Sequence, residues 1–355
     1  MLTRLMRTER AGRCSGVARA AGEDPAGSAP SHAGYLLVEV PLPWPSEFLQ
    51  AARLPEGLAA ACSTRRTRRL DVRPLAIAPR EPAATPGLTR VIDLRRPEGA
   101  FATYTRREFL LPTERVAALA EALLDDRDLG PFAAHRVPGA ARDLLVCTHG
   151  SEDACCGLEG GRLFDLARRE HGDVPGLRVW RASHFGGHRF APTLIDMPAG
   201  DSWAHVDAAA LRTIVRRDAP PATVRARHRG WGGLGFFEQL VAREALVREG
   251  WAWVGWRKAG SALAVDPPDG SLANPVFTDR PVRRVRVRVT FASDGGERGA
   301  YEGTVELTGS ADGLGACGAS GWRRNAYRVV DLRRTAGLVP VEAALCAAGT
   351  RAGER

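Results

Sequence analysis

The chain has 355 residues, of which 44% are hydrophobic and 26% charged, so it is not disordered along its whole length. Its net charge of +9 is compatible with an anionic partner, although an arginine-rich genome is the favoured explanation of such a charge. No apolar run is long enough for a membrane span, and the first residues lack the apolar core of a secretory signal. Seven scattered cysteines form a poor disulfide framework, so we expect a cytoplasmic protein.

The first part of the chain alternates between strand and helix patterns. β-Branched and aromatic runs predict strands, and apolar residues at helical spacing predict helices. The predicted strands are 35–40, 72–77, 89–94 and 103–110. The predicted helices are 46–61, with a break expected at Pro55, and 113–124. This mixture predicts an N-terminal α/β domain over residues 12–130.

The central part has a different order of elements. The predicted strands are 144–146, 177–183 and 191–198, and the predicted helices are 160–171 and 208–217. Strand, helix, strand, strand, helix is the order that a minimal thioredoxin-like unit requires. We therefore expect an α/β fold with a thioredoxin-like central domain over residues 140–220.

The last part is predicted to be a helical connector followed by a small β-rich region. A helix at 236–248 and an aromatic, strand-like run at 251–256 form the connector, residues 221–258. Residues 258–281 read as a linker, and 309–321 as a long glycine-rich loop. The predicted strands 282–291, 301–308 and 326–334 form a C-terminal β-rich region over 281–335. No stretch of the sequence repeats another.

Two cysteines and two histidines dominate the central part. Eight residues separate Cys147 from Cys156, and three separate His184 from His188. Both pairs lie where a hydrophobic run ends in a glycine-rich turn, so their side chains can converge on a metal or an iron–sulfur cluster. Cys155 adjoins Cys156, and two adjacent thiols cannot readily reach one metal. One of them is therefore a spectator, and Cys155 is the alternative ligand.

The residues around these ligands suggest how the site is shaped. Gly186 and Gly187 allow the backbone between the histidines to fold closely around a bulky group. Asp153 is placed to order the cysteine loop by accepting hydrogen bonds from its amides. Three further residues are candidates for contacts that support the ligands, with surface charge or core packing as the alternative: Trp180, Arg181 and Arg189.

The ligand types leave the metal open. Structural zinc sites commonly place two to four residues between paired cysteines, and the spacing here is longer. Two thiolates and two imidazoles also suit a 2Fe–2S cluster, although Rieske centres interleave the two ligand types. A zinc site and a 2Fe–2S cluster are both compatible with this pattern.

Several segments resemble the sucrase/ferredoxin-like family, whose fungal members are thioredoxin-like ferredoxins: CTHGSEDACC, VWRASHFGGHRFAPTLIDMPAGDSW and RHRGWGG. The resemblance implies a 2Fe–2S cluster held by Cys147, Cys156, His184 and His188. It implies a soluble one-electron carrier rather than a catalyst, with a reductase or an acidic redox protein as partner. The sequence offers no pair of catalytic carboxylates that would support sucrase activity.

A basic, glycine-flanked patch lies beyond the central part. It consists of Arg225, Arg227, His228 and Arg229, and it either docks an acidic electron donor or forms a solvated loop. Nucleic-acid binding would need a recognised module, and the sequence contains none. Two other functions remain open: a structural zinc protein with the same ligands, and a thiol redox protein acting through Cys155 or Cys156 without a C-x-x-C motif.

Overall fold

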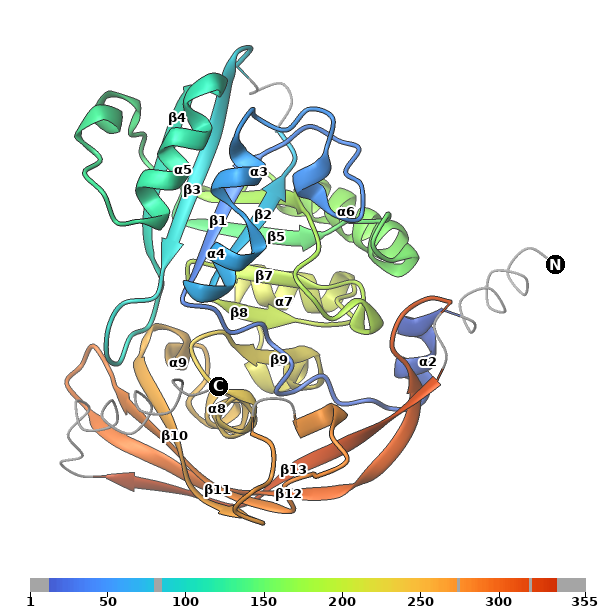
Figure 1. Cartoon of the computed structure of the whole chain (residues 1–355). Helices are drawn as coiled ribbons and strands as arrows, with labels where there is room; N and C mark the ends of the chain where they lie inside the picture. The colour runs from blue at the N-terminus through green and yellow to red at the C-terminus, as the bar shows by residue number, and fades with distance from the viewer. Residues whose placement is uncertain (1–12, 80–84, 273–274, 319–320, 337–355) are drawn as a thin grey trace.

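Figure 1 shows the computed structural model of the chain, which describes residues 13–79, 85–272, 275–318 and 321–336. Within these ranges the strands form a mixed sheet of nine strands and an antiparallel sheet of four strands. The predicted α/β fold, with a thioredoxin-like centre and a C-terminal β-rich region, is confirmed. Among the described residues, no helix combines the length and the apolar character that a membrane span requires.

The first part of the nine-stranded sheet comes from residues before 113. Its strands are β1 (Gly34–Glu39), β2 (Val72–Ile77), β3 (Leu88–Arg95) and β4 (Thr105–Pro112). Its helices are α2 (Cys14–Ala20), η1 (Phe48–Gln50), α3 (Leu58–Ala61), α4 (Thr64–Arg69), η2 (Thr113–Arg115), α5 (Val116–Leu124) and η3 (Gly130–His135). Of the helix predicted at 46–61, the break expected at Pro55 is confirmed, but the segment before it is not a continuous helix. The chain around Pro55 forms short helical turns instead, as a proline inside a helical pattern favours.

The central part follows the predicted order closely. Its strands are β5 (Arg142–Cys147), β6 (Leu177–Ala182), β7 (Leu194–Met197) and β8 (Asp201–Trp203). Its helical segments are η4 (Cys156–Gly160), α6 (Gly161–His171), η5 (His188–Phe190), α7 (Ala208–Arg216) and η6 (Pro221–Arg227). Strand β6 is parallel to β5, whereas β7 and β8 continue the sheet antiparallel on the other side. This is the strand order of a thioredoxin-like unit.

The same strand order occurs twice, although the sequence shows no repeat. In the first part, β2 is parallel to β1, and β3 and β4 follow antiparallel on the other side. The full order is β4-β3-β1-β2-β6-β5-β7-β8-β9, so the two units meet through β2 and β6. The contact is a single antiparallel pair, Ile77 with Ala182, which are the last residues of their strands. The carboxyl ends of both units' parallel strands therefore approach one another.

The chain after 227 covers one end of this sheet. Strand β9 (His228–Trp231) joins its edge, followed by α8 (Phe236–Glu249) and α9 (Ala252–Gly255). The second sheet consists of β10 (Arg257–Asp266), β11 (Arg284–Ala292), β12 (Arg298–Leu314) and β13 (Gly321–Ala336), with η7 (Pro275–Phe277) beside it. Helix α8 lies between the two sheets in Figure 1.

Three local predictions in this region are wrong. The aromatic run 251–256 contains the helix α9 and not a strand. Trp253 packs against Phe291 and Tyr301 from this helical turn, so its burial does not require a strand. Residues 258–266 of the predicted linker belong to β10. Its many small side chains give no strand pattern, but the strand pairs with β11. The glycine-rich loop is largely hairpin, because β12 extends to Leu314.

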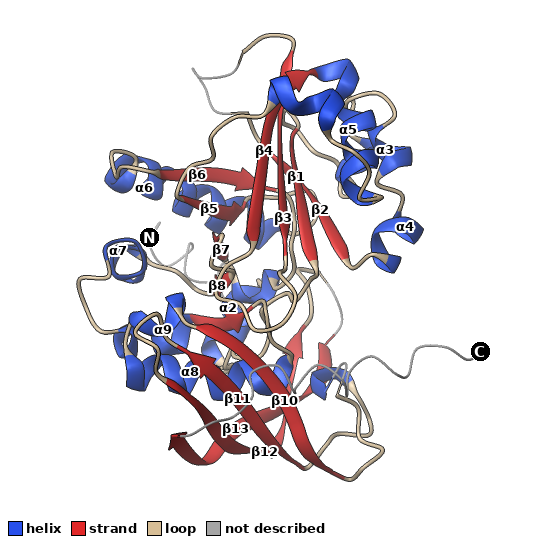
Figure 2. Ribbon diagram, turned by 90° about the vertical axis from the view of Figure 1, so that its left-hand side faces the viewer, coloured by secondary structure: helices blue, strands red, loops and turns tan. Residues whose placement is uncertain are grey.

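A buried ion-pair network connects the two units, whose strands run in different directions in Figure 2. Arg178 of β6 donates to both carboxylate oxygens of Glu108 of β4, at 2.7 and 2.9 Å, and to Asp143 of β5 at 2.7 Å. Arg106 pairs with the same two carboxylates, at 2.7 and 2.5 Å. Burial acts to raise the pKa of Glu108, but Arg178 and Arg106 outweigh it, so this pKa lies below its ordinary value.

We predict that Glu108→Gln lowers the free energy of unfolding at neutral pH by about 3 kcal/mol, because buried arginines lose their partner. The folded-state pKa of Glu108 is depressed, so its stabilisation is complete above about pH 4.5 and is lost as the pH falls through the folded-state value. The difference between wild type and variant should therefore shrink in acid. Urea unfolding between pH 7 and pH 3 measures it.

Glu170→Gln is the matched control, because Glu170 is 43% exposed and pairs with Arg169 at the surface. Its effect should stay below about 0.5 kcal/mol at any pH. Equal effects of the two substitutions would contradict a role for Glu108 in joining the two units.

Candidate metal centre

The two predicted cysteine ligands come together because a helix starts directly against the end of a strand. Cys147 is the last residue of β5, and Cys156 begins the helical turn η4 that continues into α6. A Cβ atom on Gly160 would lie 1.8 Å from the carbonyl oxygen of Cys147, and one on Gly157 would lie 2.7 Å from the Cα of Gly150. Only glycines permit this approach, and both cysteines are buried as a result.

The two histidines flank a turn that only glycine adopts readily. His184 follows β6, and His188 begins η5. Between them, Gly186 and Gly187 have φ values of +93° and +84°, in the left-handed region. The turn brings the two imidazole rings to 5.3 Å between centroids, at an interplanar angle of 80°.

Three of the four predicted ligands are grouped. The Nδ1 atom of His184 lies 3.7 Å from the sulfur of Cys147 and 3.8 Å from that of Cys156, and all three ligand atoms lie within 4.8 Å of one another. His188 is adjacent, but its Nδ1 atom lies 3.1 Å from a carboxylate oxygen of Asp153. Its Nε2 atom is therefore the one left for a metal.

Asp153 has the local role expected of it, since its carboxylate accepts a hydrogen bond from the amide of Cys155 at 2.8 Å. Cys155 points away from the group that contains Cys147. Its sulfur lies 3.7 Å from that of Cys14 and 3.3 Å from that of Cys317. The structure thus groups Cys156, and not Cys155, with Cys147 and His184.

The thiol–imidazole group stabilises a negative charge on Cys147, while the contact with Cys147, together with burial, raises the pKa of Cys156 well above its ordinary value. A hydrogen bond from Cys156 lowers the pKa of Cys147 well below its ordinary value despite burial, and His184 adds to this effect. Arg229 lies beneath the histidine turn, 2% exposed, and donates to the carbonyl of Gly186 at 3.1 Å. Burial lowers the pKa of Arg229 to about 10, so it stays charged at neutral pH. An anionic cluster fits this donor set and its buried counter-charge.

A further histidine, which the motif analysis passed over, orders the site. The Nδ1 atom of His149 accepts a hydrogen bond from the amide of His184 at 3.2 Å, and its Nε2 atom lies 2.8 Å from the carbonyl of Pro45. An imidazole in these two contacts is neutral, with its proton on Nε2. His149 lies in the CTHG run, two residues after Cys147, and this position could have identified it as part of the site.

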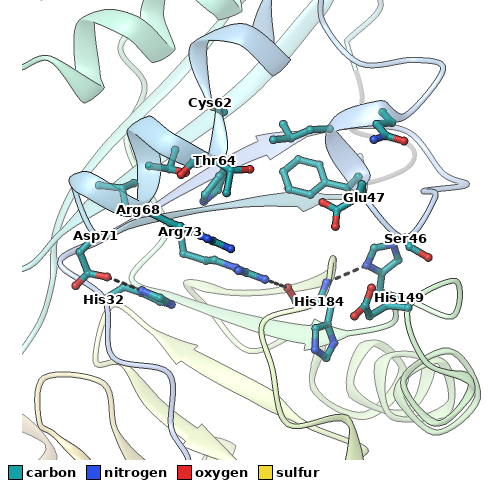
Figure 3. A pocket seen from close by; sticks show the side chains of 17 residues that line it. His32, Ser46, Glu47, Cys62, Thr64, Arg68, Asp71, Arg73, His149 and His184 are labelled. Atoms are coloured by element: carbon teal, nitrogen blue, oxygen red, sulfur yellow. Dashed lines mark hydrogen bonds and ion pairs between the residues drawn. The ribbon is translucent and has the colours of Figure 1, made fainter. Parts of the chain in front are cut away.

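A cavity of about 590 Å³ reaches His149 and His184 at one end, and Figure 3 shows the side chains that line it. The N-terminal unit supplies most of its wall. Arg73 donates to the carbonyl of His184 at 3.0 Å, and His32 pairs with Asp71 at 2.8 Å. Basic and acidic side chains both line the cavity, so its lining does not favour a ligand of one sign of charge.

The three residues expected to support the ligands contact carboxylates outside the ligand group. Trp180 donates to Asp143 at the far end of β5, at 2.7 Å. Arg181 pairs with Asp165 of α6 at 2.8 Å. Arg189, which is 9% exposed, donates to a carboxylate oxygen of Glu23 at 2.7 Å. These contacts connect the strands and the turn of the site to the surrounding structure.

The basic patch predicted for docking is wrong in two of its four members. His228 and Arg229 are 1% and 2% exposed, because β9 lies beneath helix α8 and forms part of the core. His228 pairs with Asp201 at 2.8 Å. The other two are bound to carboxylates, Arg225 to Glu244 at 2.5 Å and Arg227 to Asp207 at 2.6 Å.

A family model described as sucrase/ferredoxin-like matches residues 25–230, which is more than half of the chain. The chain belongs to the sucrase/ferredoxin-like family. The matched range contains all four predicted ligands. Searches of curated proteins and of solved structures found no match.

For this family member we predict that Gly160→Ala lowers the free energy of unfolding by about 3 kcal/mol or more, because the added methyl group meets the backbone of Cys147. Gly255→Ala is the control. Gly255 ends helix α9 with open space around it, so its substitution should be neutral or stabilise by up to about 1 kcal/mol. Denaturant unfolding of both variants measures the difference, and similar values for the two would show that η4 does not press against β5.

Proposed function

We propose that this protein transfers single electrons through a 2Fe–2S cluster held by two cysteines and two histidines. The ligands are Cys147, Cys156, His184 and His188. The observation that carries the proposal is the convergence of two buried thiols and an imidazole within 4.8 Å, with the second imidazole beside them. Membership of the sucrase/ferredoxin-like family supports the same assignment.

The cluster supplies a site that accepts and releases one electron, and the chain holds it and adjusts its charge. Two thiolates bring negative charge, whereas two neutral imidazoles bring none, so reduction is easier than with four thiolates. The buried charge of Arg229 also favours the reduced state, because it lies beneath the histidine turn.

The two histidines differ in their surroundings. Asp153 accepts a hydrogen bond from Nδ1 of His188, which orients the ring and keeps the proton on that atom. His184 is half-buried and borders the cavity, so it has access to solvent.

We place the electron partner, a reductase or an acidic redox protein, at the cavity beside His184. At this cavity a proposed ligand, His184, is open to approach from outside, whereas the two cysteine ligands are buried. No feature of the described residues calls for substrate chemistry, so we propose an electron carrier rather than a catalyst. The described cysteines are free thiols, which supports the cytoplasm as the compartment.

The test is an absorption and EPR spectrum of anaerobically purified protein, before and after dithionite, with iron and sulfide counted. We expect visible bands, a rhombic EPR signal on reduction, and about two irons and two sulfides per chain. His184→Cys and His188→Cys should each keep a cluster with a shifted spectrum and a lower potential, because a thiolate replaces a neutral imidazole. Cys156→Ser should lose most of the colour.

His135→Gln is the control, because His135 lies on η3 and bonds Arg115. Its spectrum and potential should match those of wild type. A protein that stays colourless after reconstitution with iron and sulfide would refute the proposal. In that case one bound metal lost on substitution of His184 would indicate a zinc site, and a metal-free protein would indicate thiol chemistry.

A further inference from the structure

A second group of thiols lies beside the proposed cluster site and takes no part in it. Cys14 begins helix α2, Cys155 precedes η4, and Cys317 lies in the turn between β12 and β13. Their sulfur atoms are 3.7 Å apart for Cys14 and Cys155, 3.3 Å for Cys155 and Cys317, and 3.6 Å for Cys317 and Cys14. Positions separated by as many as 303 residues therefore meet at one point.

A carboxylate completes the group. The two oxygens of Asp153 lie 3.6 and 3.7 Å from the sulfur of Cys14. The amides of Cys155 and Cys317 donate to this carboxylate at 2.8 and 2.9 Å, which holds it in place. One atom from each of the four residues lies within 4.8 Å of the others.

These distances are those of a tetrahedral zinc site. With Zn–S bonds of about 2.3 Å, neighbouring sulfurs lie about 3.7 Å apart, and a carboxylate oxygen lies about 3.5 Å from each sulfur. A disulfide needs two sulfurs at about 2.05 Å and would leave the third thiol and the carboxylate unexplained.

We propose a structural Zn²⁺ site formed by four residues: Cys14, Asp153, Cys155 and Cys317. Hydrogen-bond donors at two of the three sulfurs, those of Cys155 and Cys317, act in favour of thiolates. The hydroxyl of Ser15 donates to Cys155 at 3.2 Å, its amide donates to the same sulfur, and the amide of Cys14 donates to Cys317. Such N–H and O–H contacts stabilise thiolates bound to a metal.

The proposed ion ties together three parts of the molecule. Figure 1 shows α2 beside the end of the β12–β13 hairpin, far from the rest of the four-stranded sheet. Zinc at this point joins that hairpin and the N-terminal helix to the loop that carries Cys156. Because Asp153 also bonds His188, the zinc site positions one ligand of the proposed cluster.

The test uses the full chain, purified without chelator and analysed for zinc, iron and sulfide together. We expect about one zinc per chain in wild type and in Cys156→Ser, which removes a proposed cluster ligand. Cys317→Ser should lose at least 80% of the zinc (a fivefold loss) and keep its iron and sulfide. Cys317 lies in a half-buried turn, so this variant should fold. Cys62→Ser, at a buried thiol elsewhere, should keep both metals.

A second measurement does not depend on the variants folding. Cobalt introduced into the colourless Cys156→Ser protein should give thiolate-to-metal absorption, which Cys14→Ser should weaken. The zinc proposal would be overturned if the wild-type protein held no zinc after dialysis against a zinc-containing buffer. A disulfide between any two of the three thiols in the native protein would also overturn it. A protein that contains iron and sulfide but no zinc would overturn only the zinc proposal. A protein that contains zinc but no iron would overturn only the electron-transfer proposal.

Discussion

A buried carboxylate, Asp153, is the point on which the candidate centre depends. It is 4% exposed and accepts hydrogen bonds from the amides of Cys155 and Cys317 and from His188. Burial acts to raise the pKa of Asp153, but these bonds, His188 first among them, outweigh it, and the pKa lies well below its ordinary value. A charge so placed must keep its partners, so the cysteine loop, the histidine turn and the C-terminal hairpin are fixed relative to one another.

The doubled topology explains where such a centre can form. Each unit ends its two parallel strands at the same edge, and the β2–β6 contact brings these edges together. Only the second unit carries ligands there. The first has Val40 and Pro41 after β1, and Ala78 and Pro79 after β2, so the residues that directly follow its two parallel strands are not metal ligands. The cavity beside His184 follows from this asymmetry, since the first unit covers the ligand edge of the second without entering it.

What the sequence predicted was local, and what it missed depends on distant contacts. Hydrophobic runs ending in glycine predicted β5 and β6 correctly, because burial on both faces leaves a strong apolar pattern. The grouping of Cys147, Cys156 and His184 followed from their places at strand ends. Nothing local distinguishes Cys14 or Cys317, because the two meet across 303 residues of chain. The doubled topology was missed because it is a property of strand pairing, with no repeated sequence to reveal it.

Some of the many arginines, whose positive charge could attract an anionic partner, lie inside the folded protein. Arg178, Arg229 and Arg243 are largely or wholly buried, and each binds a carboxylate or a backbone carbonyl inside the molecule. Part of the positive charge is therefore structural and cannot steer an approaching partner. Arg229 shows the alternative use, since its charge lies beside the proposed cluster and not at a docking surface. The charge of Arg229 thus bears on the stability of the proposed anionic cluster, whereas the proposed electron partner would meet side chains of both signs at the cavity beside His184.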